Sequence, residues 1–115
     1  MKSFLTITIS IFFFINSAHA EIWICKSDRY DQVKFEITNA EIIQTYPDND
    51  GRTYKITIDT REAGIGVFGE MSNKERQYDF DIFMEYESKS VKVRKLDRMF
   101  GRSGSYIDKD CIIYE

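Results

Sequence analysis

Histidine is almost absent from this sequence of 115 residues, which also has only two cysteines and one proline. The single histidine, His19, lies in a segment that we expect to be removed on export, so the mature chain has no imidazole. Such a chain has neither a Ser-His nor a Cys-His nucleophile pair, and it has no histidine ligand for a metal. We therefore expect a protein that is not an enzyme and that uses no metal or other cofactor.

Residues 1–20 have the features of a secretory signal peptide. Lys2 supplies a positive charge, an apolar run broken only by Thr and Ser follows, and alanines occupy the −3 and −1 positions of a cleavage site after Ala20. The run is well short of the roughly 20 residues that a membrane-spanning helix needs. We predict a single β-rich exported domain over residues 21–115 that does not span a membrane.

The charge balance is slightly acidic. The chain has 16 Lys and Arg residues against 19 Asp and Glu residues, a net charge of −3, and removal of Lys2 makes the mature chain a little more negative. A basic surface is the first expectation for a protein that binds nucleic acid. We therefore expect no nucleic-acid partner. The predicted signal peptide, in turn, indicates a location in the periplasm or the extracellular space.

Cys25 and Cys111 lie near the two ends of the predicted mature chain. In an oxidising compartment, two cysteines indicate a disulfide rather than a redox or zinc site. In the chain-entropy model, closing a loop of about 86 residues stabilises a protein by about 4–5 kcal/mol. For a small domain, that contribution can decide whether the chain folds.

Short runs of alternating apolar and polar residues are separated by polar turns, and this alternation is typical of half-buried β-strands. The predicted strands are 21–26, 33–38, 42–46, 54–59, 64–70, 78–87, a strand that begins at 91, and 106–107 with 111–114. Residues 31–46 also leave room for one or two helical turns. The pattern predicts an all-β fold, a small antiparallel β-barrel or sandwich of seven to eight short strands, closed by a disulfide between the first and last strands.

Residues 64–69 read G-x-G-x-x-G, which is the pattern of a dinucleotide-binding loop. That function requires a helix directly after the glycines, whereas Glu70-Met71-Ser72-Asn73 follows here. Glycines within a strand more often mark a bulge or a sharp bend. We predict a bend and no nucleotide site.

Acidic and basic residues are separated between two neighbouring predicted strands. The strand 78–87 is acidic and the next is basic, and a turn centred on Ser88 and Lys89 places Glu85 opposite Lys92. Such a cross-strand ion pair is worth roughly 0.2–1 kcal/mol and helps to fix the register. The alternative is a basic patch that binds an acidic partner or a phosphate-bearing polymer.

The candidate binding segment is 97–106, in which two apolar residues lie between arginines in a loop with two glycines. An apolar anchor beside arginine is typical of the residues that dominate binding at protein interfaces. The alternative is that Met99 and Phe100 close the end of the barrel. Phe83, on the polar face of its strand, is a further candidate for a binding surface. The predicted partner-binding residues are Arg98, Met99, Phe100, Arg102, Ser103 and Tyr106.

Ser103-Gly104-Ser105-Tyr106 lies in a chain with a predicted signal peptide, a predicted short β-barrel, and one early and one late cysteine. This layout resembles that of the small periplasmic inhibitors of c-type lysozyme, which carry an S-G-x-x-Y inhibitory loop. The segment here is one residue shorter and lies near the C-terminus rather than mid-chain. The resemblance implies an inhibitor that acts on another exported protein.

Taken together, these features predict a small exported binding protein that inhibits or neutralises another exported protein and that is a monomer. Two alternatives remain open at this stage. One is a structural or assembly component of the cell envelope, and the other is a small barrel that carries a ligand.

Overall fold

The computed structural model describes residues 20–73 and 77–115. The predicted signal peptide, residues 1–20, therefore lies almost entirely outside the described residues. Among the residues that are described, no helix is both long enough and apolar enough to cross a membrane.

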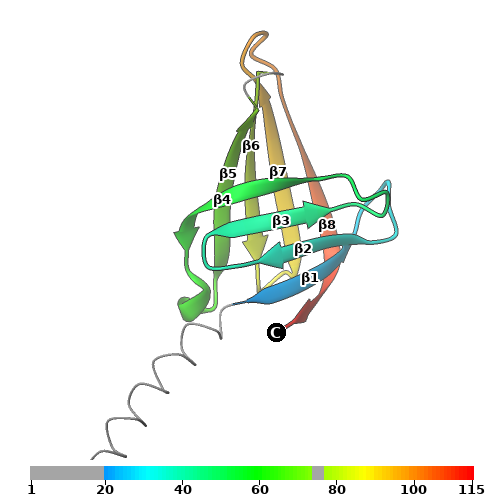
Figure 1. Cartoon of the computed structure of the whole chain (residues 1–115), viewed down its shortest axis with the longest axis vertical. Helices are drawn as coiled ribbons and strands as arrows, with labels where there is room; N and C mark the ends of the chain where they lie inside the picture. The colour runs from blue at the N-terminus through cyan, green and yellow to red at the C-terminus, as the bar shows by residue number, and fades with distance from the viewer. Residues whose placement is uncertain (1–19, 74–76) are drawn as a thin grey trace, which may run out of the picture.

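Eight antiparallel strands form a closed barrel, and their order around the barrel is their order along the chain. The last strand pairs with the first, which closes the barrel (Figure 1). The all-β prediction is confirmed, and the closure shows a barrel rather than a sandwich. The strands are β1 (Glu21–Lys26), β2 (Val33–Ile37), β3 (Glu41–Thr45), β4 (Gly51–Asp59), β5 (Gly66–Asn73), β6 (Tyr78–Glu85), β7 (Ser90–Asp97) and β8 (Ser103–Tyr114), and one short 3-10 helix, η1 (Arg61–Ala63), follows β4.

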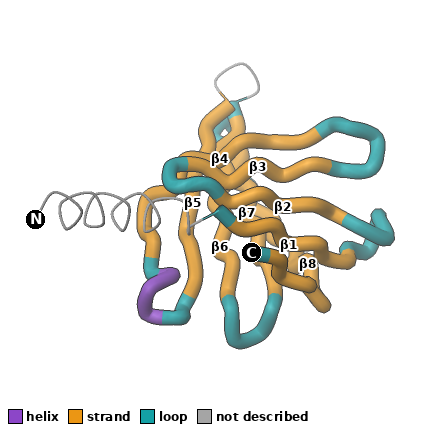
Figure 2. Tube along the Cα trace, turned by 60° about the horizontal axis from the view of Figure 1, so that its bottom comes forward, coloured by secondary structure: helices purple, strands orange, loops and turns teal. Residues whose placement is uncertain are grey.

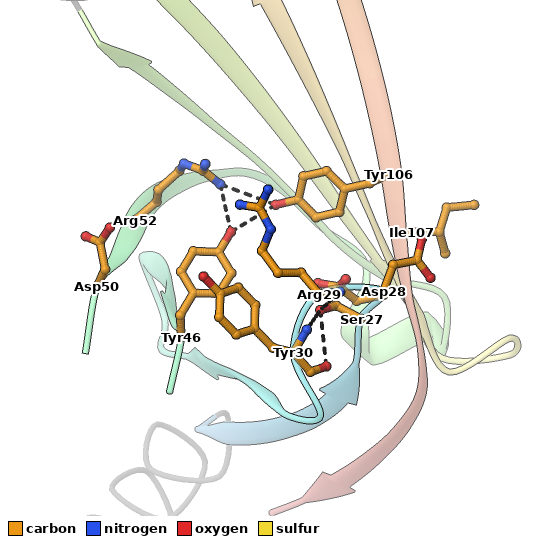
Figure 3. A pocket seen from close by; sticks show the side chains of 10 residues that line it. Ser27, Asp28, Arg29, Tyr30, Tyr46, Asp50, Arg52, Tyr106 and Ile107 are labelled. Atoms are coloured by element: carbon orange, nitrogen blue, oxygen red, sulfur yellow. Dashed lines mark hydrogen bonds between the residues drawn. The ribbon is translucent and has the colours of Figure 1, made fainter. Parts of the chain in front are cut away.

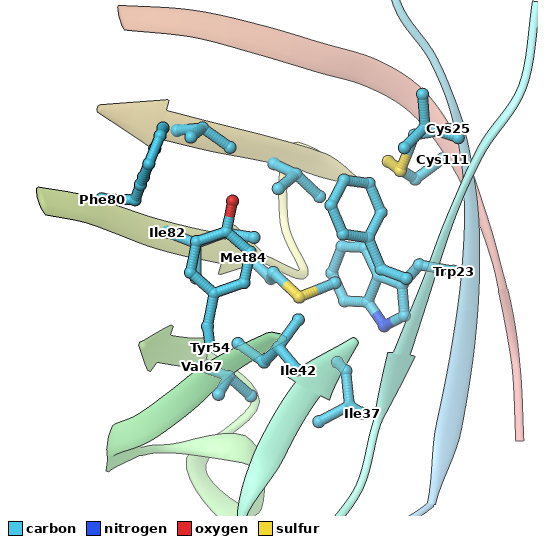
Figure 4. Packing of buried hydrophobic residues seen from close by; sticks show 14 residues of the cluster. Trp23, Cys25, Ile37, Ile42, Tyr54, Val67, Phe80, Ile82, Met84 and Cys111 are labelled. Atoms are coloured by element: carbon cyan, nitrogen blue, oxygen red, sulfur yellow. A yellow bond between two sulfur atoms is a disulfide. The ribbon is translucent and has the colours of Figure 1, made fainter. Parts of the chain in front are cut away.

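The alternation in the sequence determines which side chains enter the barrel. Along β6, Phe80, Ile82 and Met84 are buried, whereas the residues between them are only partly buried. An eight-stranded barrel is just wide enough for side chains to fill its interior, and Figure 4 shows such packing. The buried apolar cluster comprises Trp23, Cys25, Val33, Phe35, Ile37, Ile42, Tyr54, Val67, Phe80, Ile82, Met84, Val91, Val93 and Cys111.

The barrel is taller on one side than on the other. Strands β5 to β8 contain 8 to 12 residues, whereas β1 to β3 contain 5 or 6. In Figure 1 the long strands extend beyond β1 to β4, which lie across them, and Figure 2 shows the two groups from another side. The loop between β7 and β8 lies at the end of this extension.

Cys25 in β1 and Cys111 in β8 form the predicted disulfide. Both residues are buried, and the same two strands are paired along their backbones, with Ile22 opposite Tyr114 and a shift of register next to Cys25. The barrel is therefore closed both by hydrogen bonds and by a covalent bond. An intramolecular disulfide is consistent with an oxidising compartment outside the cytoplasm.

Residues 31–46 include the two predicted strands, β2 and β3, and the alternative of a helical turn there is wrong. The predicted strands 106–107 and 111–114 are parts of the single strand β8. The strand continues through Asp110, which adopts a left-handed conformation with φ of 54° next to the register shift between β1 and β8. An irregular residue is thus absorbed as a bulge instead of ending the strand.

The predicted pairing of Glu85 with Lys92 is also wrong, because Glu85 lies opposite Ser90. Residues 86–89 form a four-residue turn in which Lys89 has a positive φ of 50°. The centre of the hairpin is therefore one residue earlier than predicted, and the register differs by two residues.

The β6–β7 hairpin still carries a cross-strand ion pair, but between other residues. Asp81 lies opposite Arg94, and the Nε atom of Arg94 donates a hydrogen bond of 3.0 Å to the Asp81 carboxylate. Lys92 lies opposite Phe83, which is half-buried on the outer face of the barrel. The separation of charge between the strands therefore places an ion pair across the hairpin, although not the predicted one.

Candidate functional site

The loop between β7 and β8, residues 98–102, forms an exposed tip that carries two large apolar side chains. Met99 is 62% exposed and Phe100 is 67% exposed. The alternative that these side chains close the end of the barrel is therefore wrong. We refer to residues 98–102 as the tip.

Hydrogen bonds between Asp97 and the backbone of residues 99–102 hold the tip in one conformation. Its Oδ1 atom accepts bonds from the backbone N–H groups of Met99, at 3.0 Å, and Phe100, at 3.2 Å. Its own N–H donates to the carbonyl of Arg102 at 2.8 Å, and Gly101 closes the turn with a φ of 66°. An aspartate that accepts bonds from the backbone two and three residues later stabilises a turn. The two apolar side chains are therefore presented by a loop with a defined conformation.

The arginines of the tip interact with neighbouring side chains. Arg98 forms an ion pair with Asp79 at 3.5 Å, and Arg102 lies 3.8 Å from the carboxylate of Asp97. The guanidinium of Arg102 is also 5.3 Å from the centre of the Phe100 ring, which is a cation–π distance. The side chain of Arg102 remains 78% exposed, so its charge is accessible to a partner.

The structure separates the six predicted partner-binding residues into two groups. Arg98, Met99, Phe100 and Arg102 lie in the tip, and Ser103 is exposed next to it as the first residue of β8. Tyr106 is different, because its hydroxyl bonds to residues of β3 and β4 at the mouth of the barrel. The loop predicted over residues 97–106 is therefore shorter than expected.

The second candidate site is a pocket of about 430 Å³ at the mouth of the barrel, which we call the mouth pocket (Figure 3). Its walls come from three segments that are distant in the sequence: the β1–β2 loop, the end of the β3–β4 hairpin, and β8. The residues that line it are Ser27, Asp28, Arg29, Tyr30, Tyr46, Asp50, Arg52, Tyr106, Ile107 and Asp108.

Arg52 is the centre of the polar network in this pocket. Its Nη1 atom donates to the hydroxyls of Tyr46 and Tyr106, both at 3.2 Å, and those two hydroxyls are 3.3 Å apart. The guanidinium also lies 4.3 Å from the centre of the Phe80 ring. Beneath it, the buried amide of Gln44 donates to Tyr46 at 3.1 Å. The position of the guanidinium is thus fixed from several sides.

Tyr46 and Tyr54 beside Arg52 have raised pKa values and are neutral, so they do not balance its charge. Burial raises the pKa of Tyr46 well above its usual value of 10, and the hydrogen bond with Tyr106 raises it further. Burial likewise raises the pKa of Tyr54, whose hydroxyl donates to Gln44 at 2.7 Å. Within the described part of the chain, no carboxylate forms an ion pair with Arg52.

Asp108, on the inner face of β8, lines the same pocket. It is 1% exposed, and neither of its carboxylate oxygens has a hydrogen-bond partner among the described residues. Burial raises the pKa of Asp108 to about 6, and the negative charge of Asp28 adds to this effect. The charged residues that line the mouth pocket therefore include Arg52 and Asp108, neither of which forms an ion pair within the described part of the chain.

Sequence reasoning found the tip but missed the mouth pocket. The tip is one continuous segment, so its composition was enough to identify it. The pocket residues come from three separated segments, and only strand register brings Arg52 and Asp108 to the same cavity. Among the described residues, no three carboxylates or cysteines are grouped closely enough to hold a metal ion.

Together, the fold and the two sites define a small, disulfide-closed β-barrel with an exposed apolar loop and a polar pocket at its mouth. Comparisons of the chain with models of protein families, with curated proteins and with solved structures find no match.

Proposed function

We propose that this is an exported binding protein that captures another exported protein through the tip of the β7–β8 hairpin. The observation that carries the proposal is the exposure of Met99 and Phe100 on a loop whose backbone Asp97 holds in place. Burial of each of these two side chains against a partner is worth about 1.5–3 kcal/mol.

A loop that is already ordered binds with a smaller loss of conformational entropy than a flexible one. Arg102 stacks against Phe100 at the edge of this apolar surface and remains exposed. An acidic rim around the partner's cleft would pair with it. Inhibition or neutralisation follows if that cleft is the partner's active site.

The disulfide and the signal-like residues 1–20 support a periplasmic or secreted location. The packed interior of the barrel disfavours a ligand carrier that encloses its ligand in a central cavity. A structural role in the cell envelope remains the competing proposal, and it predicts self-association where the binding proposal predicts a monomer.

The test compares the wild-type protein with the double variant Met99→Ser/Phe100→Ser. The oxidised proteins are immobilised and exposed to an envelope extract, and bound proteins are identified by mass spectrometry. The wild type should enrich one exported protein, and the double variant should lose that enrichment at least about tenfold. A c-type lysozyme is a defined candidate that can be added separately and assayed for loss of activity.

The matched control is Ile65→Ser. Ile65 is 52% exposed in the loop between η1 and β5, outside the tip. This variant should capture the partner as the wild type does. Equal capture by the tip variant would contradict the proposal, and so would a large fall in its melting temperature, because Phe100 would then be part of the folded core.

A further inference from the structure

Asp108 differs from Glu21, the second acid that is buried among the described residues. The carboxylate of Glu21 is also buried, but it accepts hydrogen bonds from the Trp23 indole, at 3.1 Å, and from the Tyr86 hydroxyl. Asp108 accepts none from the described residues. A buried carboxylate without partners is strongly unfavourable, so a ligand that donates hydrogen bonds to Asp108 would be favoured at this site.

The surroundings of Asp108 favour a cation as that group. Asp28 lines the same pocket, and its negative charge acts on Asp108. The rings of Tyr30 and Tyr46 also line the pocket, with their centres 4.9 Å apart and their planes tilted by 30°. Carboxylates together with the faces of tyrosine rings are the groups that bind ammonium ions in proteins.

A second charge on the ligand is indicated by Arg52. Its guanidinium lines the pocket and donates to hydroxyl and amide oxygens, among them the Tyr106 hydroxyl at 3.2 Å and the Gln44 side-chain oxygen at 3.5 Å, none of which carries a formal counter-charge. Tyr106 and Asp108 are two residues apart on the same face of β8, so their Cα atoms are roughly 7 Å apart. Arg52 and Asp108 therefore lie at different places in one cavity, which Arg29, Asp28 and Asp50 also line.

We infer that the mouth pocket binds a small zwitterion, whose ammonium group pairs with Asp108 and whose carboxylate or phosphate group pairs with Arg52. A simple cation would leave Arg52 without a counter-ion, and a simple anion would leave Asp108 without one. A volume of about 430 Å³ is within the range of small-molecule sites in proteins. The tip takes no part in this site, so the inference does not depend on the proposed function.

A series of amino acids with increasing separation between the two charges tests the inference. The probes are free glycine, γ-aminobutyrate and ε-aminocaproate, with hexylamine and hexanoate as analogues that carry one charge each. Binding to the wild-type protein is measured by calorimetry at about pH 7.5, where Asp108 is ionised. We expect one of the two longer amino acids to bind at least about tenfold more tightly than glycine, hexylamine and hexanoate.

Variants assign the binding to the two charges. Asp108→Asn and Arg52→Gln should each weaken binding of the preferred amino acid at least about tenfold. The matched control is Asp110→Asn, an exposed acid on the same strand whose positive φ suits asparagine. This variant should bind like the wild type, and so should Met99→Ser/Phe100→Ser.

Three results would overturn the inference. The first is that no amino acid of the series binds at concentrations up to about 10 mM. The second is that hexylamine or hexanoate binds as tightly as the preferred amino acid. The third is that Asp108→Asn binds that amino acid with the affinity of the wild type. The chain-length series uses the wild-type protein alone, so it remains decisive if Arg52→Gln fails to fold.

Discussion

At the scale of single residues, Asp108 couples the stability of the barrel to pH. Its pKa in the folded protein is about 6, compared with 3.8 in its ordinary state. Between these two values the folded state binds a proton that the unfolded state has released, so the free energy of unfolding decreases as the pH rises. Above the folded pKa the full penalty of a buried anion is present, and the shift corresponds to about 3 kcal/mol.

Replacement of Asp108 by asparagine should remove this penalty. We expect Asp108→Asn to be more stable than the wild type by about 1–3 kcal/mol at about pH 7.5, and the difference should vanish near about pH 4, where the wild-type carboxyl is protonated. Urea unfolding across this pH range measures the effect. Asp110→Asn should show no such pH-dependent difference. If the free energy of unfolding varied with pH in the same way for the wild type and Asp108→Asn, the penalty would be absent, and water or another group would already solvate the carboxylate.

At the scale of structural elements, Gly66 determines how β5 begins. The predicted bend is present: Gly64, which caps the C-terminal end of η1, has a φ of 74°, and β5 starts at Gly66 with a φ of 153°. A Cβ atom at Gly66 would lie 1.9 Å from the carbonyl oxygen of Met84 on the neighbouring strand. Gly66 therefore permits close strand pairing, and Gly64 permits the left-handed turn before it.

Gly66→Ala should consequently destabilise the protein by about 2 kcal/mol or more, because both the clash and the positive φ oppose the new side chain. Gly104→Ala is the matched control, since a Cβ atom there has no neighbour within 4 Å. It should be neutral or stabilise β8 by about 0.5–1 kcal/mol. Urea unfolding of the two variants compares them, and equal midpoints would contradict the close approach at Gly66.

The strands could be predicted where the sequence alternates and where a turn has a strong signal. Strand β1 was predicted to the residue, and the turn that begins at Pro47 separates β3 from β4 as expected. The β6–β7 register could not be predicted, because it depends on whether Lys89 adopts a positive φ, and lysine has no special preference for that conformation.

The candidate sites likewise differ in whether consecutive residues or strand register determine them. The tip could be found because its residues are consecutive, but the mouth pocket depends on the register of strands that are far apart in the sequence. Tyr106 illustrates the limit, since it was singled out as part of the loop and in fact bonds to Arg52 inside the mouth of the barrel. The composition of the segment pointed to Tyr106, but only the fold shows that its hydroxyl contacts Arg52.

At the scale of the whole molecule, closure of the barrel depends on the seam between β1 and β8. Backbone pairing along this seam removes the two free strand edges that would otherwise be exposed. The disulfide links residues 86 apart across the same seam. A closed barrel without free edges supports the expectation of a monomer.

Removal of the disulfide should reveal how much of the closure depends on the covalent bond. We expect Cys25→Ala/Cys111→Ala to lose up to about 4–5 kcal/mol of unfolding free energy, because the unfolded chain is no longer restricted by a loop of this length. Small domains are stable by only about 5–15 kcal/mol, so the loss is a large part of the total. Urea unfolding of the oxidised wild type and the variant measures it.

Size-exclusion chromatography with light scattering provides the second measurement on the same proteins. The oxidised wild type should be a monomer at all concentrations. The variant should form oligomers as the concentration rises, because β1 and β8 separate more often and expose their edges. A variant that remains monomeric and loses less than about 1 kcal/mol would show that the hydrogen bonds of the β1–β8 seam close the barrel without the disulfide.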